Sequence, residues 1–435
     1  MSESVSIGSQ CVVFPDGIKP ANLILKDSII ERIEPYQADK LDRDYKDLAI
    51  LPGVIDPHVH INEPGRTHWE GWETGTKAAL AGGVTTLVDM PLNCIPSTID
   101  TKTAKVKAES CPGKLFCDVG FWGGAVPGNA DDLQALVRMG ALGLKSFMSD
   151  PGTDEFANLD ESGLRAAMKK IAEVDSVLLL HAEWPAALVE ADGSIDSQSY
   201  AAWLATRPVE AERQAIAKVV ELSAETKCRC HIVHVASHEV LDVLEGTSIT
   251  CETCAHYLAF CAEEIPNKAT NFKCAPPIRE RVHQEGLWRA LAEGKINMVT
   301  SDHSPCPPDL KNDDFLKSWG GIAGVQMLLA ATWTGASKRG HSLSDLVKWL
   351  SLEPSKLCGL EKEIGSIAIG KLANLVIFDQ DTEFVCESLY HRHAGSPYEG
   401  RTWRGVVKET YLRGAQVYTD GAFREPQGTL IGNWS

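Results

Sequence analysis

The chain lacks any run of about 20 apolar residues, the length that a membrane-spanning helix needs. Its first residues also lack the basic region and apolar segment of a secretory signal, so we expect neither a membrane protein nor a secreted one. Positive charge is scarce, because 42 Lys and Arg face 59 Asp and Glu and give a formal net charge of -17. A negative field repels nucleic-acid phosphates and anionic lipids, so neither is an expected partner.

Several motifs of common enzyme classes are also missing. We find no P-loop, no dinucleotide-binding fingerprint and no serine nucleophile elbow, and the pairs Gly82-Gly83 and Gly123-Gly124 lack the flanking residues of such loops. Fixed-period repeats and low-complexity linkers are absent as well. The composition, with 44% apolar and 23% charged residues among 435, is that of an ordinary soluble globular protein.

The 13 cysteines are odd in number and scattered along the chain. This distribution favours free thiols in a reducing compartment, and we therefore expect a cytoplasmic protein. Cys228 with Cys230, and Cys251 with Cys254, resemble half-sites of a structural zinc cluster. Both pairs lie on or beside predicted core strands, where thiols act as small apolar groups, so a structural zinc is disfavoured.

Two kinds of pattern divide the chain. Residues 1–51 and 366–435 consist of short β segments separated by turns, and we predict that both ends pair into one small β-sandwich domain. Residues 52–365 alternate β-branched runs with amphipathic stretches, which is typical of parallel strands joined by helices. Eight strand candidates predict an α/β fold with a (β/α)₈ TIM-like barrel; they are 53–56, 84–88, 117–121, 142–145, 176–180, 231–234, 248–253 and 296–300.

Polar residues end these strand candidates or lie just past them, where barrels carry their catalytic groups. They are His58 and His60, Lys145, His181, His234, His256 and Asp302. Alternation along a strand puts His58 and His60 on one face, although an isolated pair of this kind is equally typical of loop histidines. Convergence of further histidines and an aspartate at one rim favours a metal site, because imidazole and carboxylate suit zinc and similar ions.

Lys145 needs a separate explanation, because it ends an apolar run and would point into the same cavity. An ammonium in that cavity would lie close to any bound metal ion. Two unit positive charges about 4 Å apart repel by about 4 kcal/mol at an effective dielectric near 20, and divalent metals repel more strongly. Lys145 either turns away and pairs with a carboxylate, or it captures carbon dioxide and becomes an anionic carbamate that bridges two metals. The residues alone leave both alternatives open.

Several segments resemble the cyclic amidohydrolases, a family that includes dihydroorotases, hydantoinases and allantoinases. They are residues 51–60, the Lys145 segment, residues 252–257, residues 301–305 and the return at residues 365–371. The resemblance implies that His58 and His60 bind a more buried metal and that His181 and His234 bind a more exposed one. It also implies a carboxylated Lys145 as the bridge and Asp302 as both metal ligand and proton carrier. Zinc is the expected metal, with cobalt, manganese and iron as alternatives.

Within the family, the segments resemble the allantoinase group. Dihydroorotases typically carry an arginine two residues after the paired histidines, whereas this chain has the neutral Asn62. An amide cannot neutralise a substrate carboxylate, so an uncharged cyclic ureide fits better. Ala275 stands where relatives often have serine. The resemblance implies substrate contacts from Asn62, Asn93, His256 and the backbone near Cys274 and Ala275.

The implied reaction is the ring opening of allantoin to allantoate, a step of purine breakdown. Two metals would lower the pKa of a shared water, and the resulting hydroxide would attack a ring carbonyl while Asp302 transfers the proton to the leaving nitrogen. The alternatives are a hydantoinase or dihydropyrimidinase, a dihydroorotase, or a non-catalytic scaffold of the same fold. Family members are commonly homo-oligomers, so a dimer or tetramer is expected.

Overall fold

The computed structural model describes residues 4–191 and 195–434, and its secondary structure is mixed α/β, as predicted. In this described part, none of the helices has both the length and the apolar character needed to cross a membrane. All thirteen cysteines are free thiols.

Strands from both ends of the chain form one nine-stranded sheet in the order β18-β17-β16-β15-β5-β1-β2-β3, with β4 paired to β1. Antiparallel pairing of β5 with β15 joins the two ends, with Leu51 opposite Val376. The prediction that the two ends pair agrees with this sheet, while the domain limits at 51/52 and 365/366 stay predictions. The strands are β1 (Val5–Phe14), β2 (Gly17–Lys26), β3 (Ile29–Pro35), β4 (Arg43–Asp44), β5 (Ala49–Pro52), β15 (Leu375–Val385), β16 (Thr402–Leu412), β17 (Ala415–Thr419) and β18 (Ala422–Phe423).

Parallel strands occupy the middle of the chain and neighbour one another in chain order, as β6-β7-β8 and β9-β10-β11-β12-β13-β14. Only Trp122 separates β8 from β9. Val59 at the end of β6 pairs with His303, just after β14, so the first and last parallel strands also lie side by side. The strands are β6 (Val54–Val59), β7 (Val84–Asp89), β8 (Asp118–Phe121), β9 (Gly123–Gly124), β10 (Leu144–Phe147), β11 (Val177–His181), β12 (Arg229–Ile232), β13 (Thr250–Cys254) and β14 (Met298–Thr300).

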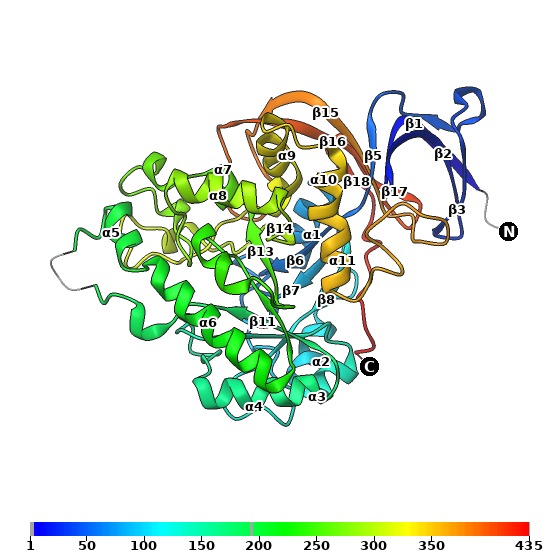
Figure 1. The fold of residues 1–435 in the computed structure, drawn as a ribbon. Coiled ribbons are helices and arrows are strands. Elements are labelled where there is room, and N and C mark those ends of the chain that lie inside the picture. The colour runs from blue at the N-terminus through cyan, green and yellow to red at the C-terminus, as the bar shows by residue number, and fades with distance from the viewer. Residues whose placement is uncertain (1–3, 192–194, 435) are drawn as a thin grey trace.

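Helices surround the parallel strands, and the blue N-terminal strands lie to one side of them (Figure 1). Helix α4 illustrates why these segments are helical. Asp160 caps its first turn by accepting from Gly163 N at 2.7 Å, and apolar residues spaced three or four apart face inward. The helices are α1 (Trp72–Ala81), α2 (Thr101–Glu109), α3 (Leu133–Met139), α4 (Glu161–Ala172), α5 (Tyr200–Ala205), α6 (Val209–Thr226), α7 (Ala255–Ala259), α8 (Arg281–Ala292), α9 (Leu328–Lys338), α10 (Leu343–Val347) and α11 (Glu353–Leu357).

Apolar side chains from several parallel strands form one buried cluster that includes Val88, Trp122, Leu179 and Met298. On β11, Val177 and Leu179 belong to this cluster, and alternation puts His181 on the same face. The cluster is therefore a packed floor beneath the polar residues at the strand ends.

The strand boundaries differ from the sequence-based expectation at several places, and two of the differences concern site residues, Lys145 and His234. Strand β10 begins at Leu144 and runs to Phe147, so Lys145 lies inside the strand and not at its end. Strand β12 ends at Ile232, before His234, whose φ of 42° lies in the left-handed region and cannot continue an extended strand.

Gly53 connects the terminal sheet to the first parallel strand. A substitution there tests how closely this connection packs against Thr85 of β7. A Cβ there would lie 2.1 Å from Thr85 Oγ1 and 2.9 Å from Thr85 Cβ. We expect Gly53→Ala to lower the free energy of unfolding by about 1–3 kcal/mol, the usual cost of overpacking. Denaturant unfolding measures the loss. Gly320→Ala is the control, since no atom lies within 4 Å of its added Cβ, and equal stability of the two variants would contradict the prediction.

Candidate active site

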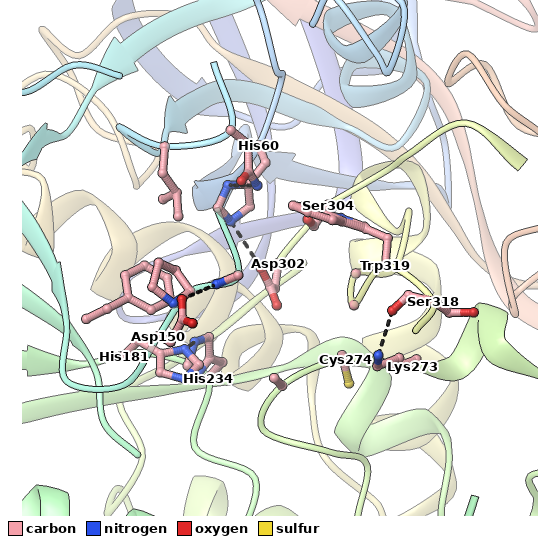
Figure 2. A pocket seen from close by; sticks show the side chains of 18 of the residues that line it. His60, Asp150, His181, His234, Lys273, Cys274, Asp302, Ser304, Ser318 and Trp319 are labelled. Atoms are coloured by element: carbon pink, nitrogen blue, oxygen red, sulfur yellow. Dashed lines mark hydrogen bonds and ion pairs between the residues drawn. The ribbon is translucent and has the colours of Figure 1, made fainter. Parts of the chain in front are cut away.

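A cavity of about 420 Å³ opens at the carboxyl ends of the parallel strands. Most of the predicted site residues line it, namely His58, His60, Asn93, His181, His234, Cys274, Ala275 and Asp302. Figure 2 shows His60 directed toward Asp302, His181 beside His234, and Lys273 beside Ser318 on another side of the cavity. Lys145, Asn62 and His256 are buried and do not belong to the lining.

The first histidine pair converges on the aspartate. His58 Nε2 lies 3.2 Å from Asp302 Oδ1, and His60 Nε2 lies 3.6 Å from the same oxygen. The three donor atoms all lie within 4.8 Å of one another, a spacing that one ion could span. His58 Nδ1 is 2.5 Å from Glu252 Oε1, a contact in which a protonated Nδ1 donates to the carboxylate. A carboxylate behind the imidazole is typical of metal-binding histidines.

A carboxylate also supports the second histidine pair. His181 Nδ1 and His234 Nε2 lie 2.9 Å apart, and His181 Nε2 donates to Glu183 Oε2 at 2.7 Å. Arg207 pairs with the same Glu183 oxygen. The rings of His58 and His234 have centroids 5.4 Å apart, so the two histidine pairs adjoin.

His234 faces the cavity because its backbone departs from strand alternation. His231 contacts Glu252 and Val233 belongs to the packed floor, so both point inward, and regular alternation would turn the next side chain outward. The φ of 42° at His234 brings this side chain back to the inside. A non-glycine residue in this region costs of order 1–3 kcal/mol, which adjacent structure must offset.

Lys145 is fully buried, and its Nζ has no hydrogen-bond partner among the described residues. Its nearest aromatic neighbour is Phe147, whose ring centre lies 4.3 Å from Nζ. Burial lowers the pKa of Lys145 to about 7, although the carboxylates of Glu252 and Asp302 act in the opposite direction. The first of the two alternatives, an ion pair between Lys145 and a carboxylate, is therefore not observed among the described residues. With this pKa, a large fraction of the amine is neutral at neutral pH.

The carboxylates and imidazoles shift one another's protonation. Burial lowers the pKa of His58, but Asp302 and Glu252 more than offset this effect, so the pKa is raised. Burial raises the pKa of Asp302, but His58 and His60 outweigh it and hold the pKa below its usual value. Asp302 is therefore ionised at neutral pH. The four imidazoles, the aspartate and the partnerless amine together fit divalent cations.

The residues predicted to contact the substrate differ from one another in their hydrogen bonds. Asn62 Nδ2 donates to Pro305 O at 3.2 Å while its buried Oδ1 has no partner, and Asn93 Nδ2 lies 3.2 Å from His60 Nδ1. Both asparagines have left-handed φ, 65° and 67°, which asparagine tolerates better than most residues. Burial lowers the pKa of His256 to about 4, although Asp302 opposes this shift, so its ring is neutral. Their contacts with substrate stay predictions.

Two supporting carboxylates, Glu183 and Glu252, were not singled out from the sequence. Glu183 follows His181 by two residues, and the same alternation that paired His58 with His60 could have found it. Glu252 is central in β13 and serves two histidines, His58 at 2.5 Å and His231 at 3.1 Å. Lys273 was also not among the predicted site residues. It lines the cavity and donates to Ser318 O at 2.6 Å.

Comparison with known proteins defines the class. The model of the amidohydrolase family matches residues 49–417. The chain is 44% identical to an allantoinase of Streptomyces avermitilis, covering 97% of this chain and 96% of that one. It is 41% identical to an allantoinase of Saccharomyces cerevisiae, with 98% of each covered. The solved L-hydantoinase of Arthrobacter aurescens superposes with a TM-score of 0.91 at 26% identity, over 98% of this chain and 99% of that one.

The fold and the buried histidine and carboxylate cluster are those of a metal-dependent hydrolase. The chain belongs to the amidohydrolase family, which the match over residues 49–417 establishes.

Glu252→Gln tests the support behind His58. The amide keeps the shape of the side chain but removes the charge that orients the imidazole, so we expect divalent metal to bind about 10–100-fold more weakly. Metal content after dialysis against a chelator series measures the change. Glu245→Gln, on an exposed side chain, is the matched control. Parent-like retention by Glu252→Gln, in a variant that melts as the parent does, would contradict the assignment.

Proposed function

We propose that this protein hydrolyses the cyclic ureide allantoin to allantoate, a step of purine breakdown. The observation that carries the proposal is the cluster of two histidine pairs and Asp302 at one cavity. Lys145, buried outside the lining, has no hydrogen-bond partner at Nζ among the described residues. The allantoinases named above, at 41–44% identity over nearly the whole chain, support the substrate. The enzyme is a cyclic-amide hydrolase.

We further propose that the parallel strands close into a (β/α)₈ barrel spanning residues 52–365. Chain-order pairing and the bridge between Val59 and His303 support this closure. Residues 1–51 and 366–435 would then form the small β-sandwich domain, supported by the pairing of β5 with β15.

His58, His60 and Asp302 would hold one divalent cation, and His181 with His234 would hold the other. A carbamate on Lys145 would bridge them, and its negative charge would replace an ammonium that two cations would repel. When bound, such cations acidify a water and polarise the carbonyl that is attacked. Zinc is the proposed metal, because neutral imidazole and carboxylate are its usual nitrogen and oxygen ligands.

Asp302 would accept the proton of the attacking water and give it to the leaving ring nitrogen. Its ionised carboxylate and its position at the cavity wall, beside both His58 and His60, support this role. Protonation of the nitrogen lets the carbon–nitrogen bond break without expelling an amide anion.

Asn62, Asn93 and the neutral His256 would hold the ureide, together with the backbone at Cys274 and Ala275. Amide and imidazole groups match the uncharged donors and acceptors of a ureide, and Asn62 offers no positive charge for a carboxylate. We propose a cytoplasmic homo-oligomer, a dimer or tetramer, as the working form. The net charge of -17 does not favour association with nucleic acid or anionic membranes.

The proposed substrate is tested by assaying the metal-loaded enzyme with allantoin, hydantoin, dihydropyrimidine and dihydroorotate under the same conditions. We expect the highest kcat/KM with allantoin, and the lowest with dihydroorotate because its carboxylate would be buried unpaired. A preference for hydantoin or dihydroorotate would reassign the enzyme within the family, and inactivity toward all four with both metals bound would indicate a scaffold.

Asp302→Asn tests the proton step. The amide cannot accept the proton, so we expect turnover to fall by about 10²–10⁴-fold, the usual contribution of general acid–base catalysis. Turnover is measured together with metal content, which separates a lost proton carrier from a lost ligand. Asp309→Asn, on an exposed loop residue, is the control. Turnover near the parent level would exclude this role for Asp302.

Lys145→Ala tests the carbamate. Removing the bridge should lower both metal content and activity, and short carboxylic acids such as acetate should restore part of each by supplying a replacement carboxylate. Metal analysis and activity with and without acetate measure the rescue. Unchanged metal content in Lys145→Ala would count against a bridging carbamate, whereas Lys105→Ala, at an exposed lysine of α2, should behave as the parent.

A further inference from the structure

A second set of metal-binding side chains shares Asp302 with the site described above. Cys254 Sγ, a ring nitrogen of His256 and a carboxylate oxygen of Asp302 all lie within 4.8 Å of one another. The exposed fractions of Cys254 and His256 are 0%, and that of Asp302 is 7%. The group thus combines a thiol, an imidazole and a carboxylate in a protected position.

The strand register explains why these three residues converge. Cys254 ends β13 and pairs with Thr300, which ends β14, so the segments that leave the two strands run side by side. His256 is the second residue of α7, which begins directly after Cys254. Asp302 follows Thr300 by two residues, and its φ of 44° turns the chain there. The convergence is therefore fixed by backbone pairing.

Of the three donors, Cys254 and His256 have few other contacts, whereas Asp302 is shared with His58 and His60. Neither ring nitrogen of His256 makes a hydrogen bond of ordinary geometry among the described residues, although the Ser301 backbone lies close enough to act on its pKa. Cys254 Sγ makes one weak contact, 3.7 Å from Thr300 Oγ1. His231, a buried histidine on the neighbouring β12, is different, because Thr250 and Glu252 engage its two nitrogens at 2.7 Å and 3.1 Å. A fully buried imidazole that makes no hydrogen bond of ordinary geometry indicates a site for a ligand.

We propose that Cys254, His256 and Asp302 bind an additional thiophilic divalent cation, such as Zn²⁺ in excess or Cd²⁺, and that its binding inhibits the enzyme. Thiolate, imidazole and carboxylate are zinc ligands, and the soft thiolate selects such metals over Mg²⁺ or Ca²⁺. Binding breaks the S–H bond of Cys254, forms the metal–sulfur bond and releases the proton to solvent.

Inhibition follows from the shared aspartate. A carboxylate has two oxygens, and a cation that draws one of them toward Cys254 and His256 moves Asp302 away from its position between His58 and His60. The same cation also occupies the lone pairs with which Asp302 would accept a proton. Repulsion from cations at the histidine pairs weakens this additional site, so it fills only when metal is in excess.

Cadmium added to the metal-loaded full-length enzyme tests the inference without substrate. Cadmium bound to a thiolate absorbs in the ultraviolet, whereas cadmium that merely replaces a catalytic ion at nitrogen and oxygen ligands does not. We expect the parent to gain this absorbance and retain extra cadmium, and its turnover to fall over the same concentration range. Cys254→Ser should need about tenfold or more cadmium for half-inhibition, at least the effect of losing a residue that supports a metal ligand.

Cys251→Ser is the matched control, because Cys251 is a buried thiol on the same strand but contacts Lys295 O instead of Asp302. It should retain the absorbance and the inhibition of the parent. Equal cadmium uptake by parent and Cys254→Ser, or absence of the thiolate band from the parent itself, would overturn the inference. The parent spectrum keeps the test valid even where Cys254→Ser folds poorly. Because cadmium uptake needs no substrate, failure of this site is distinguishable from failure of the proposed reaction.

Discussion

The burial of Lys145 without a partner is the constraint on which the site depends. Removing an ammonium from water costs several kcal/mol unless an opposite charge or a hydrogen bond compensates. The described residues provide no hydrogen bond at Nζ, and the charges of Glu252 and Asp302 do not outweigh the effect of burial on the pKa. Interior position in β10 prevents the side chain from reaching solvent. The amine must therefore lose its proton or gain a compensating group. Burial lowers the pKa of His60, His181 and His234, so these imidazoles supply lone pairs and not positive charges. An anionic carbamate between two cations would balance the charge of the whole cluster.

The supporting structure holds the imidazoles in the required orientation. Glu252 and Glu183 each fix the proton of one histidine, which leaves the opposite nitrogen toward the cavity. Left-handed backbone at His234 and Asp302 costs free energy that the packed floor and the neighbouring strand pairs offset. The same turn at Asp302 brings it within reach of Cys254 and His256. One strained residue is thus shared by two sets of donors, which couples the proposed catalysis to metal concentration.

The alternation of apolar runs and amphipathic stretches was enough to predict the mixed α/β class and to single out five residues of the cavity wall, whereas the family resemblance supplied three more. The five are His58, His60, His181, His234 and Asp302, and the three are Asn93, Cys274 and Ala275. The alternation could not predict the details that decide geometry. Lys145 lies inside β10 because strand ends depend on pairing with β9 and β11, which local sequence does not contain. His234 faces inward only because of its left-handed backbone, which no period-two pattern indicates. The supporting role of Glu252 depends on contact with His58, 194 residues away in the chain.

The sheet that combines both ends of the chain has a consequence for biosynthesis. Strand β5 is made early, yet its antiparallel neighbour β15 begins only at Leu375, after all the parallel strands. While the ribosome is still translating the central region, the backbone N–H and C=O groups on that side of β5 have no neighbour, and an unpaired strand edge is a template for aggregation. The nascent N-terminal strands therefore keep this edge exposed until β15 has been made, and a chain truncated before Leu375 would keep it exposed even with every histidine of the cavity in place.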